Sequence, residues 1–432
     1  MAARGRFGRW SVMTDSAGPK IAYIMSRFPK LTETFVLYEM IRMEQEGFSI
    51  EVYPLLRERR PVNHPEAQRL VQRAHYLHFF SLSILKANLY FMRRSWKSYF
   101  RLWMEVLSET WGSLNFFCGA IAILPKSVCF AYLMQEEGID HIHCHFVNHP
   151  TMAAFIIHRL TGIPYSFTAH GSDLHVDRRM LARKTEASAF GITVSRYNKE
   201  LMVRECGEKS RQKIHVIHCG VDTELFHPRL TNGGGDAQAP LQVLCVGSLE
   251  EVKGHRYLLE ACSELVRGGV DFRCHVVGEG PLRAKIERLI VRWELRDCVH
   301  LLGARSRQEV LNMLGKADVV VLASVPTREG KREGIPVALM EAMACSLPVV
   351  ASNISGIPEL IESGRNGFLV RPRDSRGLAR ALRRLKQDPG LRRRIGQSSR
   401  RTVIRDFNLE INASRLSRLF RTQCRATGAS EE

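Results

Sequence analysis

The sequence contains no CxxC pair among its 11 cysteines, and none of its Cys/His clusters has the ligand spacing of a zinc site. The basic N-terminal residues lead into residues 10–19 without the long apolar run that a secretory signal requires. An odd number of scattered cysteines also does not suit a disulfide framework. These absences predict a protein of the reducing cytoplasm with no zinc site.

Signatures of helix-turn-helix, RRM and zinc-finger modules are absent too, which argues against a dedicated nucleic-acid-binding protein. The charge is nevertheless strongly positive, with 63 Lys and Arg against 44 Asp and Glu and a net charge of +19. The stretch from Arg376 to Arg425 alone holds 15 basic and 3 acidic residues. This excess predicts a polyanionic partner, either an anionic membrane surface or a phosphorylated ligand, and keeps a noncatalytic polyanion-binding protein as a minor alternative.

Length and composition indicate a multidomain globular protein. At 432 residues, 45% hydrophobic and 25% charged, the chain is long enough for two or three domains with sizeable cores. Short apolar runs separated by amphipathic stretches predict βαβ units and a doubly wound parallel sheet in the first half. The strands expected there cover residues 20–26, 48–56, 141–146, 164–170, 190–195 and 213–220, with a helix at 34–47.

A second series of the same kind follows a Gly- and Pro-rich segment. Residues 228–240 have no hydrophobic period and are expected to contain the linker between two domains. Two Rossmann-like domains joined in this way face a central cleft, where ligands bind beyond the carboxyl ends of the strands. The strands expected in the second domain cover residues 241–247, 272–278, 299–303, 319–324 and 347–352.

Residues 76–135 do not fit a compact crossover and are expected to form a helical insert. Residues 86–101 contain five basic residues and no acidic one. This pattern is typical of a helix in a membrane interface, and the alternative is a core helix with a solvated basic face. The apolar run 114–124 is about half a bilayer span, and Pro125 is expected to interrupt it, so we expect no transmembrane span. The side chains expected on one apolar side are Trp96, Tyr99, Phe100, Trp103 and Leu107.

The most informative segment covers residues 332–361, in which Glu333 and Glu341 lie eight positions apart. The turn through Gly334 and Pro336 leads into a helix whose free N–H groups suit a diphosphate. Glu341, about two turns on, is placed to accept hydrogen bonds from vicinal sugar hydroxyls. From spacing alone, two such glutamates are more often solvated helix positions, so both interpretations stay open at this point.

This segment resembles the E-x7-E element of the retaining GT-B glycosyltransferases of family 4, and a PVVAS-x-x-x-G-I-P-E-like run follows it. Residues 169–173, 220–228 and 277–281 are similar to other motifs of that family, and residues 26–40 and 141–151 resemble its colanic-acid and exopolysaccharide subgroup. The resemblance implies a GT-B fold with an acceptor-side domain at 20–227, a helical insert at 76–135, a linker at 228–240, a nucleotide-sugar-binding domain at 241–400 and a basic C-terminal helix and tail at 401–432.

The resemblance also assigns roles to single residues. His170 and Glu333 would contact the transferred sugar and Lys253 the diphosphate, which makes these three the expected catalytic set, while Glu341 would contact the ribose. Ser248 departs from the pattern, because the family usually has arginine there; the cations that could replace it are Arg305, Arg328, Lys331 and Arg332. The expected donor-binding residues are Gly247, Ser248, Gly278, Glu279, Gly280, Arg305, Gly334, Ile335, Pro336, Val337, Ala338 and Glu341.

Without the resemblance, several of these residues have plainer interpretations. Lys253 is then a surface cation at a helix start and His170 a satisfied turn residue. His141, His143 and His145 alternate on one face of an expected strand, but no carboxylate lies at a fixed spacing from them. We interpret that face as cleft lining or a buried polar edge and expect no metal site.

The implied reaction is retaining transfer of a hexose from a nucleotide diphosphate sugar, with UDP preferred to GDP, to a polyprenyl-diphosphate-linked oligosaccharide or polysaccharide in exopolysaccharide or cell-surface polysaccharide synthesis. The departing phosphate oxygen would take the acceptor's proton, and no metal or other cofactor is expected. The basic insert and tail predict a peripheral position on the inner face of the cytoplasmic membrane. The alternatives are a nucleotide-sugar epimerase of the same fold, an inactive polyanion-binding relative and, for the tail, an amphipathic helix that closes over the first domain.

Overall fold

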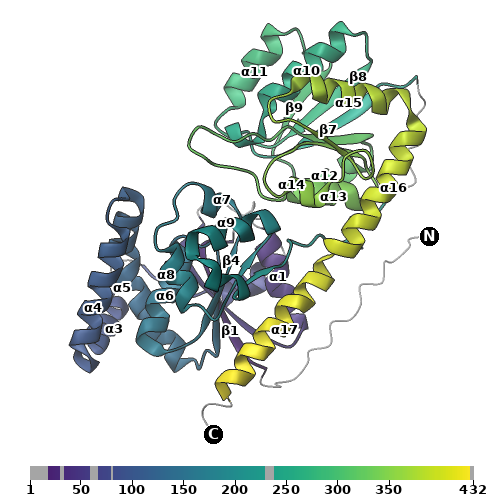
Figure 1. Cartoon of the computed structure of the whole chain (residues 1–432). Coiled ribbons are helices and arrows are strands. Elements are labelled where there is room, and N and C mark those ends of the chain that lie inside the picture. The colour runs from purple at the N-terminus through teal and green to yellow at the C-terminus, as the bar shows by residue number, and fades with distance from the viewer. Residues whose placement is uncertain (1–17, 30–33, 59–66, 79–80, 229–237, 429–432) are drawn as a thin grey trace.

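The computed structural model describes residues 18–29, 34–58, 67–78, 81–228 and 238–428. They form two α/β domains, each built on a six-stranded parallel sheet (Figure 1). The expected two-domain architecture of doubly wound sheets is therefore confirmed. The N-terminal segment, residues 229–237 of the expected linker and the last four residues of the tail lie outside the described residues.

The first domain has the strand order β2-β1-β3-β4-β5-β6. Its interior strands are buried on both faces, which is why they occur as near-continuous apolar runs in the sequence. The strands are β1 (Lys20–Phe28), β2 (Ser49–Arg57), β3 (His141–His145), β4 (Tyr165–Ala169), β5 (Phe190–Thr193) and β6 (Ile214–Val216). The helices around them are α1 (Thr34–Gln45), α2 (Ala67–Gln72), α6 (His149–Thr161), α7 (Ser172–His175), α8 (Leu181–Ala187), α9 (Arg196–Cys206) and the 3-10 turn η1 (Glu208–Gln212).

The helical insert consists of α3 (Leu82–Arg94), α4 (Trp96–Thr110) and α5 (Leu114–Glu136), which lie together at one end of the molecule (Figure 1). The expectation that Pro125 interrupts the apolar run is wrong, because α5 continues through it. Proline removes one intrahelical hydrogen bond, but packing of the following turns offsets this loss. Val128 and Phe130 are fully buried, and Lys126 donates from Nζ to the carbonyl oxygens of Leu55 and Leu77.

In the described part of the chain, α5 is the single helix that is long and apolar enough to cross a membrane. It packs against α6 and β2 in the core of the first domain, and 56% of its most apolar stretch is buried. The single apolar side expected for α4 is also wrong. Tyr99 is buried whereas Trp96 and Phe100 are 60% and 50% exposed, since the helix has aromatic residues on both its inner and its outer face.

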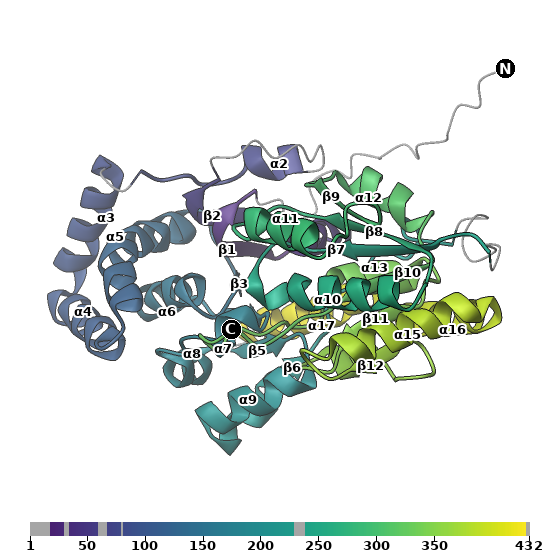
Figure 2. The same ribbon diagram turned by 90° about the horizontal axis from the view of Figure 1, so that it is seen from above.

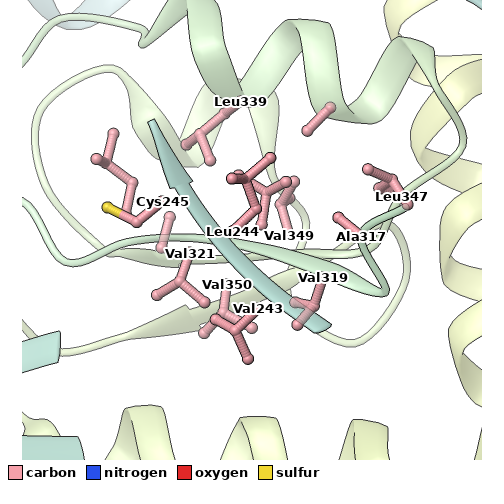
Figure 3. Close-up of a cluster of buried hydrophobic side chains, with 14 of the residues drawn as sticks. Val243, Leu244, Cys245, Ala317, Val319, Val321, Leu339, Leu347, Val349 and Val350 are labelled. Carbon is pink, nitrogen blue, oxygen red and sulfur yellow. The ribbon is translucent and has the colours of Figure 1, made fainter. Parts of the chain in front are cut away.

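The second domain has the strand order β12-β11-β10-β7-β8-β9, which is that of a dinucleotide-binding Rossmann sheet. Figure 3 shows its core, where Val243 and Leu244 of β7 pack with Val319 of β10 and Leu339 of α13. All five expected strands are present; the short β12 was not expected. The strands are β7 (Leu241–Val246), β8 (Phe272–Val277), β9 (Val299–Gly303), β10 (Val319–Leu322), β11 (Val349–Ser352) and β12 (Phe368–Val370). The helices are η2 (Glu251–Lys253), α10 (His255–Arg267), α11 (Arg283–Arg292), α12 (Arg307–Leu314), α13 (Val337–Ala344), α14 (Ile357–Leu360) and α15 (Ser375–Gln387).

The two C-terminal helices connect the domains. α16 (Pro389–Asp406) leaves the second domain, and α17 (Leu409–Gly428) runs back along the first (Figures 1 and 2). Phe420 of α17 is fully buried against Phe48, His141 and Phe190. The arginines of α17 lie on its exposed side. The basic C-terminal segment therefore contributes to the core of the first domain, as the alternative of an amphipathic closing helix anticipated.

Candidate active site

The loops that follow the strands of the two sheets meet at the domain boundary. His170 and Gly171 follow β4, and Gly334 lies in the loop after β10. A Cβ atom at Gly334 would lie 2.7 Å from the carbonyl oxygen of His170, a distance that real side chains do not tolerate. This close approach places the expected donor-binding loop directly against the His-Gly segment of the first domain.

Lys253 and Glu333 are in direct contact. The Nζ atom of Lys253 donates to Oε2 of Glu333 at 2.7 Å, and Oγ of Ser324 lies 3.4 Å from the same oxygen. The alkyl chain of Lys253 crosses Gly247, where a Cβ would lie 3.4 Å from its Cδ. Both charged side chains are largely buried, with 18% and 15% exposed. Two of the three expected catalytic residues thus form a charge-neutral pair at the ends of β7 and β10.

Close backbone contacts explain the expected glycines. A Cβ at Gly278, whose φ is +144°, would lie 2.0 Å from the carbonyl oxygen of Gly247. A Cβ at Gly280 would lie 2.6 Å from that of Leu249. The loops after β7 and β8 are also joined by a hydrogen bond of 3.0 Å from the backbone N–H of Leu249 to the backbone carbonyl oxygen of Glu279. These positions therefore form one surface on which a ligand can approach the main chain closely.

Two charged residues of the expected donor set lie in loops and have partners on the helix that follows. Glu279 pairs with Arg283 at 2.7 Å, and Arg305 pairs with Glu309 at 3.4 Å. Both pairs are solvent-exposed, so they constrain the side chains only weakly. The side chains can turn toward a ligand at small energetic cost.

The surroundings of Ser248 contain a different cation from the arginine of the family pattern. Glu250 accepts from Lys331, and this hydrogen bond holds the pKa of the Glu250 carboxyl below its usual value. Arg332 instead donates to the hydroxyl of Tyr197 in the first domain at 3.1 Å. Of the four cations considered from the sequence, Lys331 is thus joined to the segment of Ser248 through Glu250.

Helix α13 presents its N-terminus at this site. It begins at Val337 after Pro336, and no side chain caps it, so the N–H groups of Val337 and Ala338 have no intrahelical acceptor. Such a helix end favours an anion. Ile335, just before it, is buried and packs at Gly356. The helix begins four residues after Glu333, the partner of Lys253.

Glu341 lies in the second turn of α13. Burial raises the pKa of its carboxyl to about 7, and the nearby guanidinium of Arg307 opposes this shift. No described residue forms a hydrogen bond with the carboxylate. The Arg307 guanidinium lies 4.3 Å from the ring centroid of Tyr38, and all three side chains line one small pocket between the domains. Glu341 is thus available as an acceptor for ligand hydroxyl groups.

The His170 ring is directed into the first domain. Its Nε2 lies 2.9 Å from Nδ1 of His145, and its Nδ1 lies 3.9 Å from Sγ of Cys219. Burial and the neighbouring His145 hold the pKa of His170 well below 6.5, so that it is neutral at physiological pH. Its backbone N–H donates to Asp173 at 3.0 Å. The main chain of His170 therefore contacts the second domain, while its ring contacts His145 and Cys219 of the first domain.

Glu39 was not singled out from the sequence, although it belongs to the segment that resembles the exopolysaccharide subgroup. Its Oε1 lies 3.1 Å from Nε2 of His145 and accepts from the hydroxyl of Tyr23 at 3.1 Å. A carboxylate on α1 and two histidines, 106 and 131 positions further on, thus form one chain of hydrogen bonds. No sequence spacing signals this arrangement, because only the sheet brings the groups together.

The alternating histidines have different environments. His141 and His143 are fully buried and hydrogen-bond with Ser166 at 2.7 and 2.8 Å, so they form the buried polar edge that the alternation suggested. Burial lowers the pKa of His141 to about 3. A second group of ligand-capable side chains, Glu51, His75 and Glu137, lies on the other side of β1. Within this second group, Nε2 of His75 lies 3.3 Å from Oε2 of Glu51 and 3.6 Å from Oε2 of Glu137.

Glu359 links the domains beside the site. Its two carboxylate oxygens accept from the backbone N–H groups of Arg196 and Tyr197 at 2.8 and 2.9 Å, at the start of α9. A second-domain residue thereby satisfies a helix end of the first domain. The sequence contains this residue in its G-I-P-E run, but nothing in that run indicates a partner in the other domain.

Comparison with known protein families agrees with this geometry. Residues 112–225 match the family described as Glycosyltransferase Family 4, and residues 232–402 match the family described as Glycosyl transferases group 1. The two matches correspond to the first and the second α/β domain. They leave out the first strands and α17.

Two relatives are named for polysaccharide synthesis. The chain is 41% identical over 202 residues to WcaL of Escherichia coli K12, named as a colanic acid biosynthesis glycosyltransferase; the match covers 46% of this chain and 49% of WcaL. It is 38% identical over 208 residues to the amylovoran biosynthesis glycosyltransferase AmsK of Erwinia amylovora, covering 48% of this chain and 50% of AmsK. The chain thus spans about half the length of the curated relatives it matches.

A solved structure matches the fold of nearly the whole chain. HepE from Anabaena, crystallised with UDP and glucose, superposes with a TM-score of 0.69 at 17% identity over 92% of this chain and 98% of HepE. The chain therefore has the fold of the GT-B glycosyltransferases, with a first domain that matches Glycosyltransferase Family 4 and a second domain that matches Glycosyl transferases group 1.

Proposed function

We propose that this protein is a retaining glycosyltransferase that moves a hexose from a nucleotide diphosphate sugar to a lipid-linked oligosaccharide or polysaccharide. One observation carries the proposal: the Lys253–Glu333 pair lies beside the uncapped N-terminus of α13, between the two Rossmann-like domains. A cation, free N–H groups and a carboxylate are the groups that bind a diphosphate and a sugar. The names of the relatives and the ligands of HepE support this assignment and favour UDP over GDP.

The donor would bind along the loops of the second domain. Its diphosphate would meet Lys253 and the N–H groups at the start of α13, while Glu341 would accept hydrogen bonds from the ribose hydroxyls. Gly278 lets the loops after β7 and β8 pack closely, and the alkyl chain of Lys253 crosses Gly247, which brings its ammonium group to this part of the site. The uridine would face the pocket that Glu341 shares with Tyr38 and Arg307.

Bond cleavage concentrates negative charge on the diphosphate. Lys253 and the α13 N–H groups would stabilise this charge more strongly in the transition state than in the ground state. Glu333 and His170 would hold the sugar as its ring acquires oxocarbenium character. In a front-face attack, the departing phosphate oxygen accepts the acceptor hydroxyl's proton, which gives net retention without a covalent intermediate.

The acceptor would approach from the first domain, which carries the helical insert. On α4, Trp96, Phe100 and Met104 are 60%, 50% and 73% exposed, and the basic side chains of Lys97 and Arg101 are exposed beside them. Exposed aromatic groups interleaved with cations suit an anionic membrane surface. We therefore place the enzyme peripherally on the cytoplasmic face of the membrane, beside a polyprenyl-diphosphate-linked acceptor.

The proposal is tested by measuring nucleotide release from UDP- and GDP-sugars, with and without a membrane lipid extract. Wild type is compared with Glu333→Ala and, as a matched control, with Glu329→Ala, whose carboxylate lies in the same loop. We expect release from one donor that requires the extract and is lost only in Glu333→Ala. Consumption of the donor without acceptor, with an isomer as product, would favour an epimerase. Nucleotide binding without turnover of any donor would indicate an inactive relative.

A further inference from the structure

Two histidine rings and one carboxylate form a continuous hydrogen-bonded chain behind the expected sugar site. Glu39 of α1 contacts His145 at 3.1 Å, and His145 contacts His170 at 2.9 Å. His145 is fully buried and Glu39 is largely buried, so water competes little for these hydrogen bonds. This hydrogen-bonded chain ends at His170, whose carbonyl oxygen lies against Gly334 of the second domain.

The chemistry of the groups fixes the direction of this chain. An ionised carboxylate only accepts, so Nε2 of His145 carries the proton that it donates to Glu39. When Nε2 carries the single ring proton of His145, its lone pair lies on Nδ1 and accepts from Nε2–H of His170. The remaining lone pair of His170 lies on Nδ1. The arrangement therefore selects one tautomer for each ring.

Aromatic packing fixes the orientation of the same rings. Phe35 and Phe146 flank His170 with centroid distances of 4.7 and 4.8 Å, and Tyr23 stacks on His145 at 5.7 Å. The Tyr23 hydroxyl also donates to Glu39, which leaves the carboxylate held from two sides. Flipping either ring would break at least one hydrogen bond in a buried site.

We propose that Glu39 and His145 are positioning residues that hold His170 in one orientation and as the Nε2–H tautomer for the transfer reaction; this inference rests on the proposed function. His170 would then meet a substrate hydroxyl as a neutral acceptor, and Glu39 would supply the counter-charge for any proton that the chain takes up. The role resembles in chemical terms a carboxylate that orients a catalytic imidazole.

Burial shifts the pKa values of three neighbouring titratable groups away from neutral pH. Burial raises the pKa of Cys219 to about 12 and that of Tyr23 well above 10, and it lowers the pKa of His143 well below 6.5. The side chains of α17 that close the adjoining cavity, among them Asn412, do not titrate. The titratable groups that face the chain are Tyr23 from β1, His143 from β3, Cys219 after β6 and Asp173 from α7, whose carboxylate accepts from the backbone N–H of His170.

The test compares wild type with Glu39→Gln and with Glu44→Gln, a matched change on the same helix that affects only the surface pairs with Arg69 and Arg73. In Glu39→Gln the amide oxygen can still accept from Nε2–H of His145 and from the Tyr23 hydroxyl, so the hydrogen bonds are kept and only the negative charge is lost. We expect kcat to fall at least about tenfold with little change in KM, and the acidic limb of its pH profile to move to lower pH. Glu44→Gln should behave as wild type.

A spectroscopic arm separates this inference from the proposed function. In ¹⁵N-histidine-labelled protein, with His170→Gln used for assignment, the wild type should show a protonated Nε2 and an unprotonated Nδ1 at His170. A protonated Nδ1 at His170 in the wild type, or kinetics of Glu39→Gln equal to those of Glu44→Gln, would overturn the inference. A wild type that transfers no sugar although His170 has the Nε2–H tautomer would instead overturn the proposed function alone.

Discussion

Nζ of Lys253 lies 2.7 Å from Oε2 of Glu333, so the cation expected to meet the donor's diphosphate is paired with the carboxylate expected to meet its sugar. The pairing neutralises two largely buried charges that would otherwise be costly to desolvate. An arriving nucleotide sugar must therefore compete with Glu333 for Lys253. The same exchange releases the carboxylate to accept hydrogen bonds from sugar hydroxyls.

Replacing Lys253 should affect the chemical step more than binding. In Lys253→Gln, the developing charge on the leaving diphosphate loses its cation, and we expect kcat to fall by about 10²- to 10³-fold. Steady-state kinetics with the identified donor measure this change. The exposed Lys285 on α11 provides the control, and equal kcat values for Lys253→Gln and Lys285→Gln would contradict the assigned role.

Glu341 should make donor binding depend on pH. Its carboxyl, with a pKa of about 7, is protonated below that pH and accepts fewer hydrogen bonds from ribose. The affinity for a nucleotide sugar should therefore rise as the pH increases through 7 in wild type. Calorimetric titration of Glu341→Gln should give a flat profile over the same range, and a pH dependence like that of wild type would count against this account.

The same residue should leave a signature in stability. The pKa of Glu341 is raised from 4.5 to about 7 in the folded protein, so the folded state binds the proton more tightly than the unfolded chain. Its contribution to the free energy of unfolding is full below about pH 4.5 and is lost as the pH rises through 7. Denaturant unfolding between pH 4.5 and 7 should show a smaller decline for Glu341→Gln than for wild type.

Glu359 should stabilise the contact between the domains. Glu359→Ala leaves the N–H groups of Arg196 and Tyr197 without their acceptor, at a cost of about 0.5–2 kcal/mol. Thermal unfolding measures the loss of stability, and small-angle scattering should show a larger radius of gyration. Glu362→Ala, in the same segment but paired only with exposed Arg365, should change neither quantity.

Phe420 tests whether α17 is part of the first domain. Its ring is fully buried against Phe48, His141 and Phe190, so Phe420→Ala should lower the free energy of unfolding by about 3–5 kcal/mol. Denaturant unfolding provides the measurement. A cost near that of a surface substitution would mean that the helix is an appendage rather than a structural element.

The exposed face of α4 should bind anionic vesicles. The triple change of Trp96, Phe100 and Met104 to serine should reduce co-sedimentation with phosphatidylglycerol vesicles at low salt. Val176, Val266 and Val291 are also exposed, and changing them to serine supplies a matched control with the same number of altered apolar side chains. Equal binding of both triple variants would argue against membrane docking through α4.

Local patterns were sufficient for most of the fold. The apolar runs of β7 and β10 and the turn before α13 are short-range features, and they predicted these two strands and this helix correctly. The three residues of β12 are too few for a pattern. The continuation of α5 through Pro125 depends on burial against β2 and α6, which no local rule contains.

In the candidate site, too, local motifs predicted some residues, and others could be recognised only from the fold. Glu333 and Glu341 were predicted from the spacing of one motif and Lys253 from the resemblance of its segment to the family, and the structure joins Lys253 to Glu333. Glu39 and Glu359 were not found, since their partners lie more than a hundred residues away and are brought close only by the sheet and the domain contact. Sequence motifs predicted the donor-side residues, whereas the groups that contact the His170 ring became apparent only in the fold.

The most direct test of the central claim follows the sugar rather than the nucleotide. Wild type and Lys253→Gln are incubated with a UDP-hexose labelled in the sugar, together with the membrane lipid extract. The account predicts that label enters the lipid-extractable product in a one-to-one ratio with released UDP, and that both fall together in the variant. Label that stays on the nucleotide, or that appears as free sugar regardless of the extract, would contradict a glycosyltransferase at this site.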